Sequence, residues 1–266
     1  MSALRVPRAD AAPAVLAAFG VAAAVDLASL ATGFEAGHTV AKPLLMPLLA
    51  TWAALRGAPR LLVVALLFGW GGDVLLLSDA EPAFLAGMAS FAVGHVCYLA
   101  LFRAHGRRET APRARAGFDA SAVDVHPEEA APRARAGLVA LGYAAALTAT
   151  VALLWPDLPA DLRVPVAAYS ALLAAMAHGA LTRLGLVAGL GGALFLLSDT
   201  LIATGVADWP QLPRPDLWIM LTYLAAQFLL TRGTLGGRRT PPSPGATDGA
   251  LRPSDAGARP GATPIA

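Results

Sequence analysis

The sequence predicts an all-α, polytopic membrane protein with about eight transmembrane helices. Hydrophobic residues make up 56% of the 266 residues and charged residues only 14%, well below the ~25% that is usual in soluble domains. The mean hydropathy of +0.59 agrees with this class, and several stretches reach the ~20 apolar residues that a spanning helix requires. We therefore expect a multi-pass protein of the cell (inner) membrane.

The first four predicted spans cover 13–33, 38–55, 60–77 and 83–102. The first resembles a signal peptide, but it is long and ends without a clear A-x-A cleavage site, so we interpret it as a retained helix. The second contains Pro43 and Pro47, which can kink a helix. The third ends on the glycine-rich string GWGGDVLLL, and the fourth is an apolar run that contains His95.

The last four predicted spans cover 137–155, 163–182, 184–205 and 215–232. The sixth begins close to Pro165, which a helix tolerates in its first turn. The seventh has a glycine-rich start and contains Asp199, and the eighth carries Tyr223 and Gln227. Residues 1–235 are thus predicted to form a single membrane domain.

Charged residues in the connections predict the orientation of the spans. Arginines gather at the N-terminus, in every second connection and in the tail, and acidic residues occupy the connections between them. Because arginine clusters mark the cytoplasmic side, both termini and the long connection at 103–136 are predicted to be cytoplasmic. This polar linker contains APRARAG twice. We expect the linker and the tail at 236–266 to be disordered, as is typical of such compositions.

Several classes of function are not supported by the sequence. The net charge of +2 is small and the basic residues are spread over the loops, so no nucleic-acid-binding face is predicted. The chain has no G-x-S-x-G, Walker A, H-E-x-x-H or C-x-x-C motif. A zinc site would need about three close ligands. The spacing of the candidate ligand residues in the sequence does not require a zinc site, so we predict neither a metal nor another cofactor. The sequence does not define the oligomeric state.

Five ionisable residues lie within the predicted spans. Lys42 is the only lysine of the chain, and Asp26, Asp73, His95 and Asp199 also fall in apolar runs. A charge inside the bilayer costs at least ~2.5 kcal/mol on insertion scales, so each such residue is a candidate functional group.

The predicted orientation places these groups at similar depths. At ~1.5 Å per residue, Asp73 and Asp199 each lie roughly 20 Å from the inner end of their spans, and Lys42 lies roughly 6 Å from the outer end. We therefore predict one polar cavity in the central-to-outer half of the membrane. Further candidates for substrate binding or for tuning charge in this cavity are Tyr169, Ser198, Tyr223 and Gln227.

The individual roles leave alternatives open. The two mid-span aspartates are expected to be functional because the cost of burial selects against idle charges. Lys42 is either a counter-ion of an aspartate or a substrate contact, and His95 is either an interior hydrogen-bonding group or a catalytic one. Asp26 is a candidate partner of Lys42 on the neighbouring span. Ser198 is expected to bond either Asp199 or a helix carbonyl.

The two halves of the chain share a pattern that suggests a parallel repeat of four spans each. The third and seventh spans both carry a glycine-rich string and an aspartate, which pairs Asp73 with Asp199. In the fourth and eighth spans, FAVGH at 91–95 can be laid on YLAAQ at 223–227. Such repeats often place a site at their interface. A competing register matches GGDVLLLSD to GGALFLLSD and pairs Asp79 with Asp199 instead.

An ordered set of short motifs connects this chain to a known family. The motifs are KPLLMPLL at 42–49, GWGGDVLLL at 69–77, FLAGMASFAVGHVCYLALF at 84–102, ALFLLSDTLIA at 193–203 and the final span with Tyr223 and Gln227. With this set, the sequence resembles the YhhN family of lysoplasmalogenase-like integral membrane proteins over about residues 15–232. The resemblance implies eight spans, a lysolipid substrate among membrane lipids, and hydrolysis of its vinyl ether bond to a fatty aldehyde and a glycerophospho-alcohol. It also implies that Asp73 and Asp199 are the catalytic pair.

The residue types suit this chemistry. Protonation of the β-carbon of a vinyl ether gives an oxocarbenium ion, water then adds, and the hemiacetal collapses. The reaction needs an acid and a base, which paired carboxylates supply in glycosidases, and the sequence does not say which aspartate is the acid. Two alternatives stay open: a transporter or exporter of a small amphiphile, and a metal-dependent lipid amidase or esterase that uses His95 with the aspartates.

Overall fold

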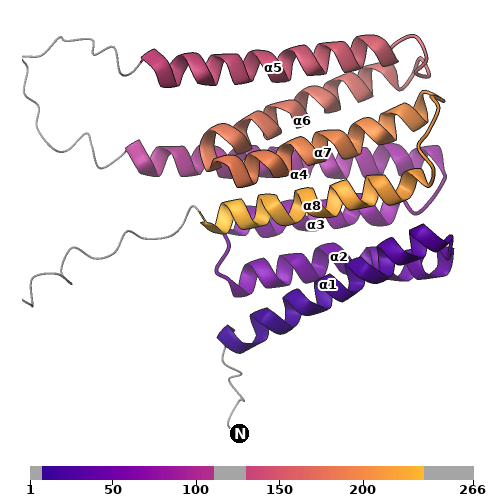
Figure 1. Ribbon diagram of the computed structural model, residues 1–266, viewed down its shortest axis with the longest axis horizontal. Coiled ribbons are helices and arrows are strands. Elements are labelled where there is room, and N and C mark those ends of the chain that lie inside the picture. The colour runs from indigo at the N-terminus through magenta and orange to yellow at the C-terminus, as the bar shows by residue number, and fades with distance from the viewer. Residues whose placement is uncertain (1–7, 111–129, 237–266) are drawn as a thin grey trace, which may run out of the picture.

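A computed structural model describes residues 8–110 and 130–236. Within these ranges the secondary structure is helical, without strands (Figure 1). The helices are α1 (Arg8–Thr32), α2 (Glu35–Leu55), α3 (Arg60–Leu75), α4 (Glu81–Thr110), α5 (Ala130–Leu154), α6 (Arg163–Leu184), α7 (Leu186–Val206) and α8 (Pro215–Gly236). Each of the eight predicted apolar stretches therefore forms a helix.

The long connection is shorter than expected. Helix α4 continues to Thr110 and α5 begins at Ala130, whereas a linker at 103–136 was predicted. These extensions are rich in alanine and arginine, which have high helix propensity, and a boundary drawn from hydropathy alone misses them. The rest of the linker and the predicted disordered tail after Gly236 lie outside the described residues.

The membrane class is confirmed by the helices themselves. Five helical segments in the described ranges are long and apolar enough to cross a membrane: Ala11–Thr32, Glu81–Ala104, Gly137–Leu154, Arg163–Leu184 and Leu186–Val206. Helix α3 has only 16 residues, or about 24 Å at ~1.5 Å per residue, which is less than the ~30 Å hydrocarbon core. The protein is thus polytopic, and the number of eight spans stays a prediction.

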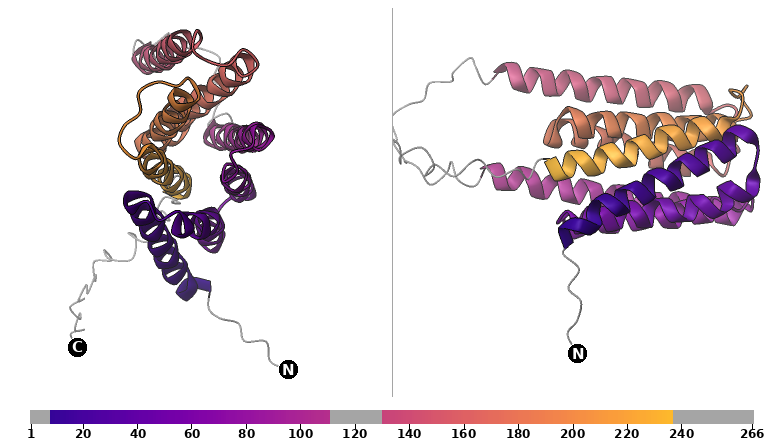
Figure 2. Two further views of the ribbon diagram at one scale, coloured as in Figure 1. Left: turned by 90° about the vertical axis from the view of Figure 1, so that its right-hand side faces the viewer. Right: turned by 60° about the horizontal axis from the view of Figure 1, so that its bottom comes forward.

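The helices run side by side in two layers, as the end-on view in Figure 2 shows. One layer contains α2, α3, α4 and α6, and the other contains α1, α8, α7 and α5. Contacts between α1 and α2 and between α6 and α7 join the layers. The start of α1 and the end of α8 lie at the same end of the bundle (Figure 1), in agreement with the prediction that both termini share one side.

Close contact between α6 and α7 depends on a glycine. A Cβ atom added to Gly192 would lie 2.7 Å from the Cα atom of Ala177 on α6, closer than carbon atoms approach. Small residues allow helix backbones to meet in this way, which is a principal source of helix association in membranes.

We predict that Gly192→Ala destabilises the protein by about 1–3 kcal/mol, the usual cost of overpacking a close interface. The measurement is the midpoint of thermal unfolding in detergent. Gly142→Ala on α5 is the matched control, since its added Cβ would meet nothing within 4 Å. Equal unfolding midpoints for the two variants would contradict the role of Gly192.

Candidate functional site

The first aspartate of the candidate pair ends a chain of hydrogen bonds between three helices. Asp73 on α3 is 2% exposed, and the Tyr223 hydroxyl on α8 donates to its Oδ2 atom at 2.9 Å. The Gln227 amide donates to the Tyr223 oxygen at 3.3 Å, and the Tyr98 hydroxyl on α4 donates to the Gln227 carbonyl at 2.8 Å. Gly69 makes room, because a Cβ atom there would lie 3.1 Å from the Gln227 nitrogen.

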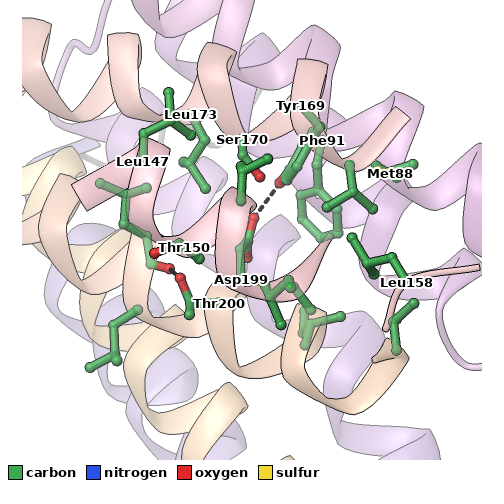
Figure 3. A pocket seen from close by; sticks show the side chains of 18 of the residues that line it. Met88, Phe91, Leu147, Thr150, Leu158, Tyr169, Ser170, Leu173, Asp199 and Thr200 are labelled. Carbon is green, nitrogen blue, oxygen red and sulfur yellow. Dashed lines mark hydrogen bonds between the residues drawn. The ribbon is translucent and has the colours of Figure 1, made fainter. Parts of the chain in front are cut away.

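The second aspartate ends a similar chain. The Tyr169 hydroxyl on α6 donates a short hydrogen bond to Oδ2 of Asp199 on α7 (Figure 3). The His95 Nε2 atom on α4 lies 3.1 Å from the Tyr169 oxygen. Because the Tyr169 hydroxyl donates to Asp199, a neutral His95 ring that bonds Tyr169 donates from Nε2 and carries no proton on Nδ1. This Nδ1 atom is buried and has no hydrogen-bond partner among the described residues.

The two chains have the same order of groups: a nitrogen donor, a tyrosine and an aspartate. One runs from His95 through Tyr169 to Asp199, and the other from Gln227 through Tyr223 to Asp73. The predicted repeat matches the two ends of these chains, since it lays His95 on Gln227 and Asp73 on Asp199, but it lays Tyr223 on Phe91 and not on Tyr169.

Aromatic rings join the two chains. Phe195 lies between them, with its ring centroid 4.7 Å from that of His95 and 5.4 Å from that of Tyr223. Phe91 packs edge-on against Phe195 at 6.3 Å and against Tyr223 at 5.8 Å. The tyrosine that holds Asp73 and the histidine of the Asp199 chain therefore border one aromatic cluster.

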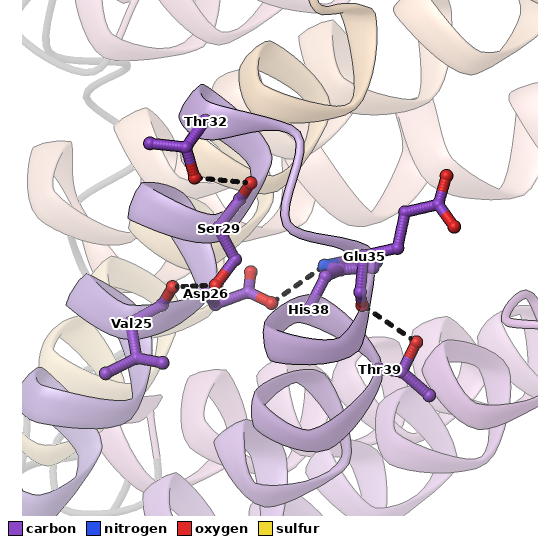
Figure 4. Close-up of polar contacts among 7 residues, drawn as sticks. All are labelled: Val25, Asp26, Ser29, Thr32, Glu35, His38 and Thr39. Atoms are coloured by element: carbon purple, nitrogen blue, oxygen red, sulfur yellow. Dashed lines mark hydrogen bonds and ion pairs between the residues drawn. The ribbon is translucent and has the colours of Figure 1, made fainter.

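Asp26 has a different partner from the predicted one. It is fully buried, and its Oδ1 atom lies 2.8 Å from Nδ1 of His38 in α2 (Figure 4), whereas the described residues contain no ion pair between Asp26 and Lys42. The other oxygen of Asp26 has no partner among the described residues. His38 was not a sequence candidate, although it precedes Lys42 by one helical turn and so shares its face.

Lys42 lies inside the bundle and is 8% exposed. Lys42 lies on α2, which packs against α3, the helix of Asp73. The described residues contain no ion pair of Lys42.

A pocket lies beside Asp199, between α4, α5, α6 and α7. It encloses about 1080 Å³ including its open mouth, and its wall is mainly apolar, with Asp199 and Tyr169 among the polar residues (Figure 3). Asp73, Lys42 and His95 do not line it. This pocket is therefore not the predicted polar cavity shared by all of these groups, because similar depth does not fix the direction in which a side chain leaves its helix, and that cavity stays a prediction.

Two further predictions can be compared with the structure. The Ser198 hydroxyl donates to the carbonyl of Ile219 on α8 at 3.1 Å, which is the helix-carbonyl alternative. In the described ranges, no three His, Cys, Asp or Glu side chains come together as a group that could hold a metal ion. His95 and the two aspartates thus do not form a ligand set.

Together, the fold and the site define a polytopic helical membrane protein with two interior aspartates, each held by a tyrosine from another helix. The family model of the YhhN family matches residues 37–234. The chain belongs to the YhhN family.

Curated relatives carry a functional name. The human protein "Lysoplasmalogenase TMEM86B" is 34% identical over 179 residues, which are 67% of this chain and 65% of that protein. Its pig counterpart is 36% identical over 63% of this chain and 60% of its own length. The "Lysoplasmalogenase" of Mycobacterium bovis is 29% identical over 90% of this chain and 85% of its own. The chain thus spans less than two thirds of the two mammalian relatives. No solved structure matches.

Proposed function

We propose that this chain is a membrane-embedded hydrolase of the cell (inner) membrane that cleaves the vinyl ether bond of lysoplasmalogens. The products are a fatty aldehyde and a glycerophospho-alcohol. The observation that carries the proposal is the position of Asp199, a carboxyl group held by Tyr169 in the wall of an otherwise mainly apolar pocket. Family membership and the names of the relatives support the same reaction.

In the proposed mechanism, Asp199 is the acid because it is the aspartate that lines the pocket. Its proton passes to the β-carbon of the vinyl ether, the π electrons form the new C–H bond, and the ether oxygen shares its lone pair to give an oxocarbenium ion. Water adds to this ion, and the hemiacetal breaks its bond to the glycerol oxygen. Paired carboxylates share the acid and base roles in the same way in glycosidases, whose reaction passes through a similar cation.

Asp73 is the second member of the pair. Its negative charge stabilises the oxocarbenium ion, and it receives the proton that is released when water adds. Lys42 is buried on α2, which packs against α3, and is the cation that we assign to favour the ionised form of Asp73. Phe91 lines the pocket and also contacts Tyr223, the hydrogen-bond partner of Asp73, so in this mechanism the Phe91 ring moves to admit the reacting water to Asp73.

The tyrosine hydroxyls are expected to matter for the rate. Tyr223→Phe removes a hydrogen bond to ionised Asp73, worth about 1.5–3 kcal/mol or roughly 10–100-fold in kcat. Tyr169→Phe removes one to protonated Asp199, worth about 0.5–1.5 kcal/mol or roughly 2–10-fold. Tyr143→Phe is the matched control, because Tyr143 lines the same pocket but, within the described residues, forms no hydrogen bond with either aspartate. A normal kcat for both site variants would contradict the assigned hydrogen bonds.

Product analysis tests the function itself. Purified protein in detergent is incubated with lysoplasmalogen and, separately, with its saturated alkyl-ether analogue, and the products are identified by mass spectrometry. We expect aldehyde from the vinyl ether alone. Binding or transbilayer movement of both lipids without products would instead favour a transporter of amphiphiles.

A further inference from the structure

Helix α5 forms a loosely packed edge of the bundle. It packs on α6 and, more sparsely, on α7, and only 6% of the residues in its apolar segment Gly137–Leu154 are buried inside the protein. In Figure 2, α5 lies at the end of its layer, next to α7. In a bilayer, most of this helix therefore faces lipid chains.

The pocket reaches the surface at the seam between α5 and α7. Ala146 and Thr150 of α5 and Leu197 and Thr200 of α7 all line it, and Leu197 is 47% exposed. Figure 3 places Leu147 and Thr150 on the same side of the pocket as Thr200. These residues belong to apolar helical segments that can span a membrane, so the medium at the seam is lipid.

The end of the pocket towards the connection between α5 and α6 is covered. Leu154, Leu158 and Val166 line the pocket there and belong to a second hydrophobic cluster that also contains Leu162 and Ala207. Leu158 is 2% exposed. Entry along the bundle axis from this end is therefore blocked by packed side chains, whereas the side between α5 and α7 is thinly covered.

We propose that the pocket takes up the single hydrocarbon chain of a lysolipid directly from the bilayer, through the seam between α5 and α7. The inference rests on the proposed function for the identity of the lipid. An aliphatic chain suits the mainly apolar wall, since the wall is similar in polarity to the lipid tails that the chain leaves, and the transfer requires no exposure to water. The vinyl ether follows the chain at its glycerol end, and Asp199 with Tyr169 provides the polar contact at which this bond would lie.

Bulky residues at the seam test the route. Ala146→Trp and Leu197→Trp fill the mouth of the pocket from its two sides. Ala145→Trp and Ala193→Trp are the matched controls, because both alanines are exposed on the same helices and neither lines the pocket. The probe is the saturated alkyl-ether lysolipid, which carries the chain but not the vinyl ether, and the readouts are the rate constant of its association and its Kd for each purified variant.

We expect the two seam variants to slow association and to raise the Kd, each about tenfold, or about 1.4 kcal/mol, because the indole ring occupies the mouth through which the chain enters. The controls should stay within about twofold, as is usual for substitutions on a surface. Thermal unfolding of all four variants identifies any that fail to fold, and the seam positions on two different helices provide independent tests.

Unchanged affinity in both folded seam variants would overturn the inference, even if the wild type cleaves lysoplasmalogen. Conversely, weaker binding in the seam variants without vinyl ether cleavage by the wild type would uphold the lipid-chain route and overturn the proposed reaction. The two failures are thus distinguishable.

Discussion

Asp199→Asn is expected to lower kcat for lysoplasmalogen by about 10²–10⁴-fold, the usual contribution of a general acid or base. Asparagine keeps the shape of the side chain and can still accept the hydrogen bond of Tyr169, but it has no acidic proton for the β-carbon. The measurement is the rate of aldehyde release by purified protein in detergent. Because Asp199 lines the pocket, this variant tests the group nearest to the proposed bond cleavage.

Asp79→Asn is the matched control for this substitution. Asp79 follows a serine, as Asp199 does, and is the residue that the competing alignment pairs with Asp199, but it lies exposed beyond the end of α3. It should retain the wild-type rate. Full activity of a folded Asp199→Asn variant would remove Asp199 from the mechanism.

Asp73→Asn is expected to lower kcat by a similar factor, about 10²–10⁴-fold. The physical reason differs from that for Asp199. Asparagine at position 73 has no negative charge to stabilise the oxocarbenium ion and cannot accept the proton that water releases. Asp73 does not line the pocket, so the Kd for the saturated alkyl-ether lysolipid should change little. A lower kcat with a nearly unchanged Kd is therefore the expected result for Asp73→Asn.

A purely structural role for Asp73 predicts a different result. In that case Asp73→Asn would lower the unfolding midpoint, since Asp73 is buried and bonded to Tyr223, and the remaining folded protein would turn over normally. Measuring kcat per folded molecule separates the two roles.

The fold could be predicted closely from hydropathy because each apolar run became a helix. The boundaries of α4 and α5 could not, since the residues beyond the apolar run are polar and still helical. The number of membrane crossings is equally hard to read from sequence, because α3 is shorter than the hydrocarbon core and helices such as α2 carry charges within them.

The sequence identifies most residues of the candidate site but not their hydrogen-bond partners. The aspartates, Tyr169, Tyr223, Gln227 and His95 do form connected hydrogen bonds. The partners of a side chain depend on the rotation of its helix, which apolar runs without a clear polar face do not define. For this reason the sequence does not identify Tyr98, one turn after His95, as the donor to Gln227.

When the proposed reaction runs in D2O, its aldehyde product carries deuterium on carbon. In D2O, protonation of the β-carbon places one deuterium on the carbon next to the aldehyde group, and immediate reduction of the aldehyde preserves it for mass spectrometry. We expect wild-type protein to convert lysoplasmalogen to singly deuterated product, and the Asp199→Asn variant to release almost none. Intact substrate after incubation with folded wild-type protein, or aldehyde without carbon-bound deuterium, would contradict vinyl ether hydrolysis by carbon protonation.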